Sequence, residues 1–281
     1  GNTNLSFSNF HKKDTTTTDH SLFNDVAGSS FISNNCTYTA DIDCKTRILN
    51  QGNVIFKNNK VISLGSGSDV AVLIDTVTEP TVFEIYGNTI TKKSALSGLL
   101  TIGNESNIGY NIMTGVIYNN SLYGGAYFDE GLDVSAQHCL SIFNQNKIKT
   151  YRNYINGTGL SYVFKSSGDD WVDALCEYNA SVNSNQGLTI KGVKNLKIYG
   201  CTLRSNKNYK QLYILDNGVY HSDGCIIKNN IIYDDSILNG NASLVIEGVH
   251  SDLEIDYNIA FSNNNTITNQ GDGSWLAWQA L

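Results

Sequence analysis

Hydrophobic and polar residues alternate in short segments that recur along the chain. Each copy carries an apolar residue, a polar pair that usually contains asparagine, and then an aliphatic residue, as in Ile85-Tyr86-Gly87-Asn88-Thr89-Ile90. Alternation over a few residues predicts strands, and a repeat of this length predicts a solenoid or a similar array. Eight copies align on one position with a mean interval of about 28 residues, at Asn59, Asn88, Asn120, Asn146, Asn179, Cys201, Asn230 and Asn258.

This pattern predicts an all-β chain, folded as a single-stranded right-handed parallel β-helix, a solenoid of about eight to ten coils. No coil can bury its apolar face alone, so the coils stack at the ordinary strand spacing of ~4.8 Å. The handedness follows from the general preference for right-handed parallel crossovers. We expect the repeated asparagines to be structural, because asparagine tolerates the left-handed conformation and stacked amides can bond one another.

Two other all-β architectures fit the sequence less well. A β-sandwich would show evenly spaced strands with frequent hairpin turns, and a propeller would show a longer blade repeat. We expect residues 31–270 to form the β-helix. The polar segment 1–30 is expected to be an N-terminal lead-in or cap, and residues 271–281 a C-terminal tail.

The amino-acid composition argues against some classes of binding partner. The chain has 281 residues, 36 of them asparagine, and a formal net charge of −7. This negative charge disfavours a nucleic-acid partner, since phosphate binding needs basic clusters. No apolar run reaches the length of a membrane span, so we expect no membrane insertion. Asn-x-Ser/Thr sequons fall inside strand-like segments, for example at Asn119 and Asn179, and this disfavours a eukaryotic secretory route.

Six cysteines are present, but none forms a Cys-x-x-Cys pair. Together with five scattered histidines, this gives no metal-ligand spacing, so we expect no metal site and no cofactor. We expect the cysteines to be buried thiols that pack as small hydrophobic residues. A disulfide between Cys36 and Cys44 is the alternative.

Two acidic segments carry the candidate chemistry. They are Tyr127-Phe128-Asp129-Glu130-Gly131-Leu132-Asp133 and Ser167-Gly168-Asp169-Asp170-Trp171-Val172-Asp173. Hydrolysis of a glycosidic bond uses two carboxyl groups, and aromatic side chains nearby can stack on sugar rings. We expect Trp171, Tyr127 and Tyr162 to bind the sugar. The same segments also suit ordinary turns, because Gly and Asp favour turn conformations.

The repeat across about residues 31–270 resembles the pectate-lyase-like superfamily of right-handed parallel β-helices, and within it the bacteriophage tailspikes. The closing segment Trp275-Leu276-Ala277-Trp278-Gln279-Ala280-Leu281 is similar to a segment after the last coils of many such proteins, where the chain continues further. The resemblance implies a homotrimer that binds bacterial polysaccharide. It also implies a virion-tail or extracellular position after assembly in the bacterial cytoplasm.

The acidic segments themselves resemble polygalacturonase-type hydrolases. Glu130-Gly131-Leu132-Asp133 is similar to their Asp-Gly-Ile-Asp, and Gly168-Asp169-Asp170 matches their Gly-Asp-Asp. This resemblance implies an endo-glycosidase with catalytic carboxylates at Asp133, Asp169 and Asp170, and Glu130 is a further candidate. Two other segments of that family, Gly-His-Gly and Arg-Ile-Lys, have no counterpart here.

Two other functions fit the same sequence. One is a non-catalytic carbohydrate-binding or structural β-helix, such as an adhesin or a tail-fibre segment, which would release no new reducing ends from a polysaccharide. The other is a polysaccharide lyase, which would use a base and form an unsaturated product.

Overall fold

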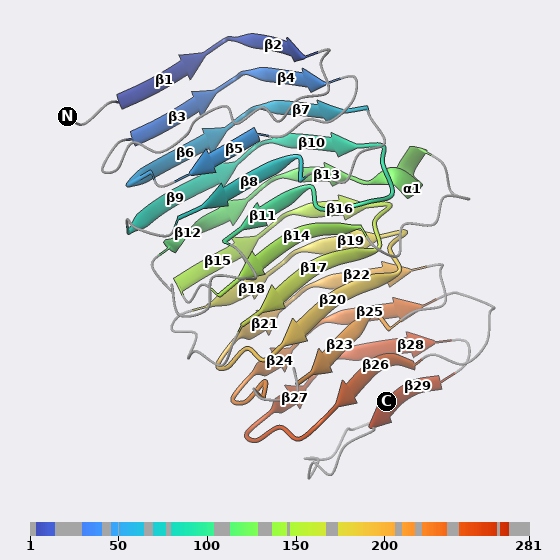
Figure 1. Cartoon of the computed structure of the whole chain (residues 1–281). Helices are drawn as coiled ribbons and strands as arrows, with labels where there is room; N and C mark the ends of the chain where they lie inside the picture. The colour runs from blue at the N-terminus through green and yellow to red at the C-terminus, as the bar shows by residue number, and fades with distance from the viewer. Residues whose placement is uncertain are drawn as a thin grey trace.

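The strands of the chain form three all-parallel sheets that run the length of one solenoid (Figure 1). The computed structural model of the chain describes residues 4–14, 30–40, 46–49, 51–64, 70–76, 80–103, 113–128, 137–144, 147–166, 174–205, 210–216, 221–234, 242–262 and 265–269. Strands that neighbour each other in a sheet come from successive coils. The fold is a right-handed parallel β-helix, and the prediction of fold class is confirmed.

We name the sheets A, B and C in the order in which a coil passes through them. Sheet A contains β1 (Asn4–Ser8), β3 (Ser30–Asn34), β6 (Asn53–Lys57), β9 (Thr81–Tyr86), β12 (Met113–Tyr118), β15 (Lys147–Tyr151), β18 (Leu175–Glu177), β21 (Lys197–Tyr199), β24 (Ile226–Lys228) and β27 (Glu254–Asp256). Sheet B contains β2 (His11–Asp14), β4 (Thr37–Ala40), β7 (Lys60–Ser63), β10 (Thr89–Lys92), β13 (Ser121–Tyr123), β16 (Tyr154–Asn156), β19 (Ala180–Val182), β22 (Thr202–Ser205), β25 (Ile231–Asp234) and β28 (Ile259–Ser262). Sheet C contains β5 (Thr46–Leu49), β8 (Val72–Asp75), β11 (Leu100–Ile102), β14 (His138–Phe143), β17 (Leu160–Lys165), β20 (Gln186–Lys191), β23 (Leu212–Leu215), β26 (Ala242–Glu247) and β29 (Asn265–Asn269).

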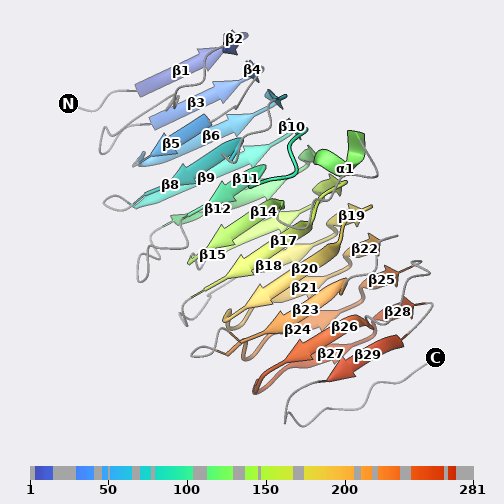
Figure 2. The same cartoon turned by 45° about the vertical axis from the view of Figure 1, so that its right-hand side comes forward.

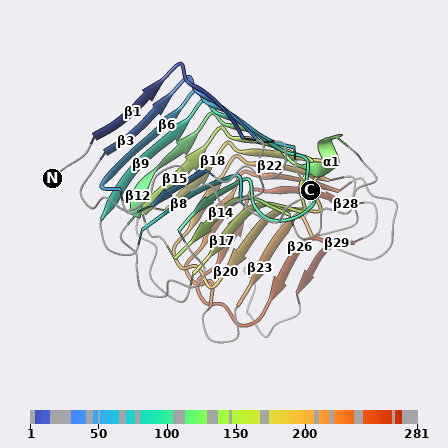
Figure 3. The same ribbon diagram turned by 45° about the horizontal axis from the view of Figure 1, so that its top comes forward.

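The three sheets form three faces around one axis (Figures 2 and 3). A single short helix, α1 (Gly125–Phe128), is described, and it lies at the ends of the strands of sheet B. The corner from sheet A to sheet B is a turn of two residues in every described coil, whereas the other two corners vary in length. The variable corners explain why the repeat interval in the sequence is irregular.

The core is a set of apolar rows along the axis. In sheet C, Leu100, Leu140, Tyr162 and Leu188 occupy one row of paired positions and all are buried. Alternate residues of each strand point inward, so stacking places equivalent side chains over one another. Gly115 shows how closely the rows fit, because a Cβ atom there would meet the ring of Phe83 at 2.6 Å.

Asparagines at the second turn residue of the A–B corner join successive coils. Oδ1 of Asn120 accepts the backbone N–H of Asn88 at 3.0 Å, and its Nδ2 donates to the carbonyl of Ile85 at 3.1 Å. These bonds satisfy backbone groups that the turn would leave unpaired inside the molecule. The structural role predicted for the repeated asparagines is confirmed for the buried side chains Asn59, Asn88, Asn120, Asn179 and Asn230.

One assignment of the repeat is wrong. The ladder position between Asn120 and Asn179 is held by Asn153, not Asn146. The segment around Asn146 joins β14 to β15, at the corner from sheet C to sheet A. Asn144, at that corner, also has a left-handed backbone, with φ of 51°. The two corners therefore share one local pattern, and only strand pairing distinguishes them.

The cysteines of the described residues are buried and free, as predicted: Cys36, Cys139, Cys176, Cys201 and Cys225. Because Cys36 is free, the alternative disulfide is not formed, and Cys44 lies outside the described residues. The segment 1–30, for which the sequence predicts a lead-in or cap, contains β1 and β2, which pair with β3 and β4. The tail 271–281 lies outside the described residues.

Candidate functional site

The expected catalytic carboxylates belong to segments whose attachment points are known. Glu130, Asp133, Asp169, Asp170 and the expected sugar-binding Trp171 lie outside the described residues, so their roles stay predictions. The first segment leads from α1 into the beginning of β14, and the second leaves the end of β17.

These attachment points lie at opposite edges of sheet C. Strands β14 and β17 are parallel neighbours, so the beginning of one and the end of the other are separated by a strand length. Six residues at about 3.3 Å each give roughly 20 Å. Two carboxyl groups that cleave a glycosidic bond stand about 5–10 Å apart. The attachment points are therefore farther apart than the two carboxyl groups of a glycosidase.

Tyr127, which the sequence predicts to bind sugar, lies in a cluster of exposed and half-buried aromatic rings. We call Tyr123, Tyr127, Phe128 and Tyr154 the aromatic cluster. Its ring centroids are 4.7 Å apart for Tyr123 and Tyr127, 5.0 Å for Tyr127 and Phe128, and 6.1 Å for Tyr123 and Tyr154. Tyr127 is 50% exposed and Phe128 44% exposed. Tyr123 and Tyr154 are half-buried beside them.

Hydrogen bonds and a close backbone contact hold α1, which carries Tyr127 and Phe128, against the solenoid. The backbone N–H of Ala126 donates to the carbonyl of Gly157 at 3.0 Å, which ties α1 to the turn after β16. The backbone N–H of Gly125 donates to Oε1 of the buried Gln137, also at 3.0 Å. A Cβ atom on Gly157 would collide with the backbone of Tyr127. Glycine at 157, with φ of 75°, therefore lets α1 lie against the solenoid.

Polar groups border the aromatic cluster. Nδ2 of Asn156 donates to the hydroxyl of Tyr154 at 3.0 Å, and Nδ2 of Asn183 donates to Oδ1 of Asn156 at 3.1 Å. Lys93 places its ammonium 5.5 Å from the centroid of the Phe128 ring. Rings with convergent hydrogen-bonding groups can bind a ligand that has both apolar faces and hydroxyl groups.

The prediction for Tyr162 is corrected. Its side chain is 0% exposed and belongs to the inward row of sheet C. Its hydroxyl donates to the carbonyls of Asn153 and Ala180 at 3.0 and 3.1 Å. Burial raises the pKa of Tyr162 well above its ordinary value. The alternation of Ser161-Tyr162-Val163 places the tyrosine inward, so no ring face is available to a sugar.

A second group of ionisable side chains lies on the outer face of sheet C. Nζ of Lys210 is 2.7 Å from Oε1 of Glu247, and the hydroxyl of Tyr213 donates to the other carboxylate oxygen. Burial acts to raise the pKa of Glu247, but the bonds from Lys210 and Tyr213 outweigh it and hold that pKa below its usual value. A carboxylate held in its ionised form is not a proton donor at neutral pH. We interpret this group as a stabilising network.

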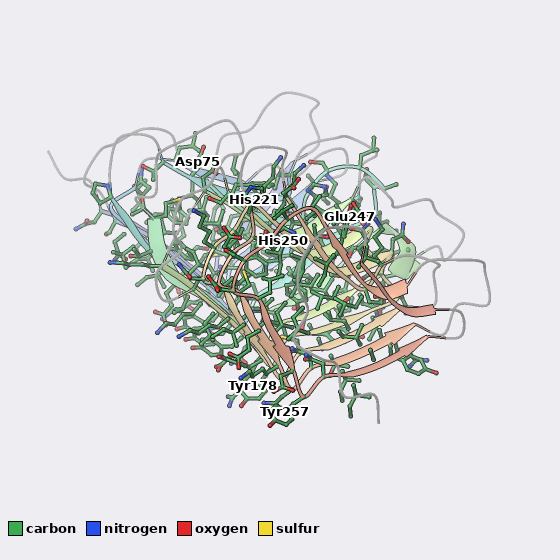
Figure 4. The ribbon with its side chains drawn as sticks, turned by 90° about the horizontal axis from the view of Figure 1, so that it is seen from below. Asp75, Tyr178, His221, Glu247, His250 and Tyr257 are labelled. Carbon is green, nitrogen blue, oxygen red and sulfur yellow. The ribbon has the colours of Figure 1, made fainter. Side chains whose placement is uncertain are left out.

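Two histidines adjoin this network in the loops after sheet C (Figure 4). Nδ1 of His250 accepts the backbone N–H of Ser222 at 3.0 Å, and Nε2 is 2.9 Å from the carbonyl of Glu247. The ring of His221 is 6.4 Å from that of His250. No group of three or more His, Cys, Asp or Glu side chains suited to a metal ion occurs within the part of the chain that the structure describes.

Sequence reasoning missed three members of the aromatic cluster. Tyr123 and Tyr154 are in outward positions of β13 and β16, neighbouring strands of sheet B. The alternating segments Ser121-Leu122-Tyr123 and Tyr154-Ile155-Asn156 carry the signal, since the central apolar residue is buried in both. To infer from the sequence that Tyr123 and Tyr154 are neighbours, one must first place Asn153 at the A–B corner of its coil.

No helix among the described residues is long and apolar enough to cross a membrane. No family model, no curated protein and no solved structure matches the chain. The functional conclusions therefore depend on the site itself.

Proposed function

We propose that this protein is a polysaccharide-binding β-helix of the tailspike-like kind, directed at bacterial surface polysaccharide. The observation that carries this proposal is the aromatic cluster. Its four rings come from α1 and two neighbouring coils, and two of them are about half exposed. Sugar rings have apolar C–H faces that pack on aromatic side chains, and their hydroxyl groups need hydrogen-bonding partners such as those on the border of the cluster.

Two further features favour a polysaccharide over other macromolecules. The net charge of −7 disfavours a nucleic acid. The tie of α1 to Gly157 and Gln137 fixes the position of Tyr127 before a ligand arrives, and such preorganisation lowers the entropic cost of binding.

Binding is tested with immobilised wild-type protein and a panel of purified bacterial capsular and O-antigen polysaccharides. Tyr127→Ala and Phe128→Ala should each weaken the Kd for the bound polysaccharide by about tenfold, the equivalent of one aromatic contact. Val82→Ala is the matched control, since Val82 is 57% exposed on the outer face of sheet A, away from the cluster. Equal affinity of Tyr127→Ala and wild type would exclude the aromatic cluster as the binding site.

We further propose that the bound polysaccharide is cleaved by an endo-glycosidase reaction. The first acidic segment supports this, because its first two residues, Tyr127 and Phe128, are the exposed rings of the aromatic cluster. Asp129 follows Phe128 directly, and the same segment carries the proposed catalytic carboxylates Glu130 and Asp133. Asp169 and Asp170 belong to the second segment, which is attached at the opposite edge of sheet C.

Cleavage is tested by counting new reducing ends. Asp133→Asn and Asp170→Asn should each abolish their release while leaving the Kd for the polysaccharide unchanged. A product with ultraviolet absorption of an unsaturated sugar would instead identify a lyase. If wild type binds the polysaccharide and releases no new ends, the protein is a binding or structural β-helix.

The homotrimer and the position on a virion tail are also proposals, and they derive from the resemblance to tailspikes. Sedimentation equilibrium of the chain tests the first. A mass three times that of one chain is expected, and a single-chain mass would exclude the trimer.

A further inference from the structure

Three side chains at the A–B corner differ from the rest of their row. The first residue of this turn has a left-handed backbone in each coil, and it is asparagine or glycine at seven positions: Asn9, Asn35, Asn58, Gly87, Asn119, Gly200 and Asn229. Arg152, Tyr178 and Tyr257 occupy the same backbone position with φ of 55°, 51° and 52°. A bulky side chain in this conformation costs about 1–2 kcal/mol, whereas asparagine and glycine tolerate it.

Burial does not compensate the two tyrosines for this cost. Tyr178 is 61% exposed and Tyr257 74% exposed. Within the described part of the chain, neither hydroxyl makes a hydrogen bond. Strained backbone conformations occur preferentially at functional positions, where the side chain has a role other than stabilising the fold.

Three other tyrosines next to this corner stabilise the fold by stacking on one another, unlike Tyr178 and Tyr257. Tyr86, Tyr118 and Tyr151 stack on one another, with centroids 4.8 and 4.9 Å apart and interplanar angles of 7° and 6°. Both faces of Tyr118 are covered by its neighbours, so its ring offers no stacking surface to a ligand. Tyr178 and Tyr257 belong to no such stack, and Figure 4 shows both on the side of the solenoid opposite His221 and Glu247.

The Tyr178 ring packs against Gly200, and only Gly200 and Asn229 separate the two tyrosines in the row. Gly200 follows Tyr178 in the row, and a Cβ atom there would meet the Tyr178 ring at 2.8 Å. Asn229 follows Gly200, and Lys228 beside it forms an ion pair with Glu254. Three coil spacings of ~4.8 Å separate Tyr178 from Tyr257, about 14 Å. A pyranose unit of an extended polysaccharide advances by a length similar to one coil, so a chain along the axis would cover both rings.

We propose that Tyr178 and Tyr257 are the stacking residues of a second polysaccharide-binding site, a strip along the A–B corner that includes Gly200 and Asn229. The ligand is an extended, hydroxyl-rich polysaccharide that lies parallel to the solenoid axis. The inference rests on the proposed function for the class of ligand, but it involves a different corner from the aromatic cluster.

The test uses substitutions that remove the ring and relieve the backbone strain together. Tyr178→Asn and Tyr257→Asn introduce the residue that five of the ten described coils already carry. The thermal midpoint of unfolding should stay equal or rise, because asparagine tolerates this conformation. The Kd for the polysaccharide should weaken by about tenfold in the double variant. Arg152→Asn is the matched control, since it changes the same backbone position without removing a ring, and it should leave the Kd unchanged.

The outcomes separate this proposal from the previous one. If Tyr127→Ala weakens binding and the double variant does not, the strip is not a binding site and the aromatic cluster stands. If the double variant weakens binding and Tyr127→Ala does not, the strip is the site and the aromatic cluster is not. If wild type binds no polysaccharide of the panel, both proposals fail. A change in sedimentation mass of the double variant would identify the strip as a protein interface and overturn the proposal.

Discussion

At the scale of the residue, one side chain type performs two tasks at one turn. The first turn residue of the A–B corner is exposed and needs a left-handed backbone, whereas the second is buried and needs an amide. Asn119 and Asn120 stand side by side in these two roles. Of these two residues, Asn120 joins the coils by its side chain, through its Oδ1 and Nδ2 atoms.

Asn120→Ala should therefore destabilise the protein strongly. The substitution leaves the N–H of Asn88 and the carbonyl of Ile85 without their partners inside the molecule. Each unsatisfied buried group costs about 1–3 kcal/mol, so we expect the two groups to lower the free energy of unfolding by about 2–6 kcal/mol. Denaturant titration measures it. Asn119→Gly, at the adjacent exposed position, should change stability by less than about 0.5 kcal/mol, and equal losses in both variants would contradict the ladder.

His250 should make stability depend on pH. Burial lowers its pKa below the ordinary 6.5, against the opposing effects of the Glu247 carbonyl and of Asp216 and Asp223, and with a small contribution from His221. Because the unfolded chain binds a proton first, the stability from His250 is present above pH 6.5 and is lost as pH falls through the folded pKa. His138 shifts in the same direction through burial.

Thermal midpoints at steps between pH 8 and pH 5 check this prediction. His250→Gln should flatten the decline below pH 6.5, with the remaining slope due to His138 and other groups. An unchanged slope in this variant would show that His250 is not the titrating group.

At the scale of the element, the position of α1 depends on a glycine in another coil. Helix propensity cannot place a helix of four residues, since so short a helix is unstable alone. The close approach to Gly157 and the bond from Gly125 to Gln137 hold it. The aromatic cluster is thus an assembly of α1 with strands β13 and β16.

Gly157→Ala should displace α1 and weaken polysaccharide binding together. The added methyl group collides with the backbone of Tyr127, and alanine is strained at φ of 75°. We expect a loss of more than about 1 kcal/mol in stability and a weaker Kd for the polysaccharide. Gly103→Ala is the matched control, with φ of 76° at a corner of sheet C, and it should lower stability without changing the Kd. If Gly157→Ala binds the polysaccharide with the wild-type Kd, the binding site does not depend on the position of α1.

At the scale of the whole molecule, the chain is a stack of similar coils. Each strand pairs only with strands of the preceding and following coils. The stability of such an array is approximately a sum over coils and their interfaces. Whole coils should therefore be removable if the register is kept.

Deletion of residues 89–120 should leave a folded solenoid. The deletion joins Asn88 directly to Ser121. Thr89 pairs with Ser121, so Asn88 then takes the place that Asn120 has before Ser121 in the native chain. Circular dichroism should keep its β signal, and small-angle scattering should show a rod shorter by about 4.8 Å. Deletion of residues 89–119 is the control, since one extra residue reverses the inward and outward faces of the next strand. Equal stability of the two deletions would contradict the register.

The sequence by itself determined the repeat, the parallel β-helix and the structural role of most asparagines. These depend on local alternation and on spacing, and both can be read along the chain. Tyr127 is predicted to bind sugar because it lies in an acidic segment, and its ring is exposed. The tertiary structure decided what depends on pairing between coils. It assigned the ladder to Asn153, buried Tyr162, brought Tyr123 and Tyr154 beside Tyr127, and attached the two acidic segments to opposite edges of sheet C. These features join residues about 20–35 positions apart, and corners of variable length hide such distances from any periodic pattern.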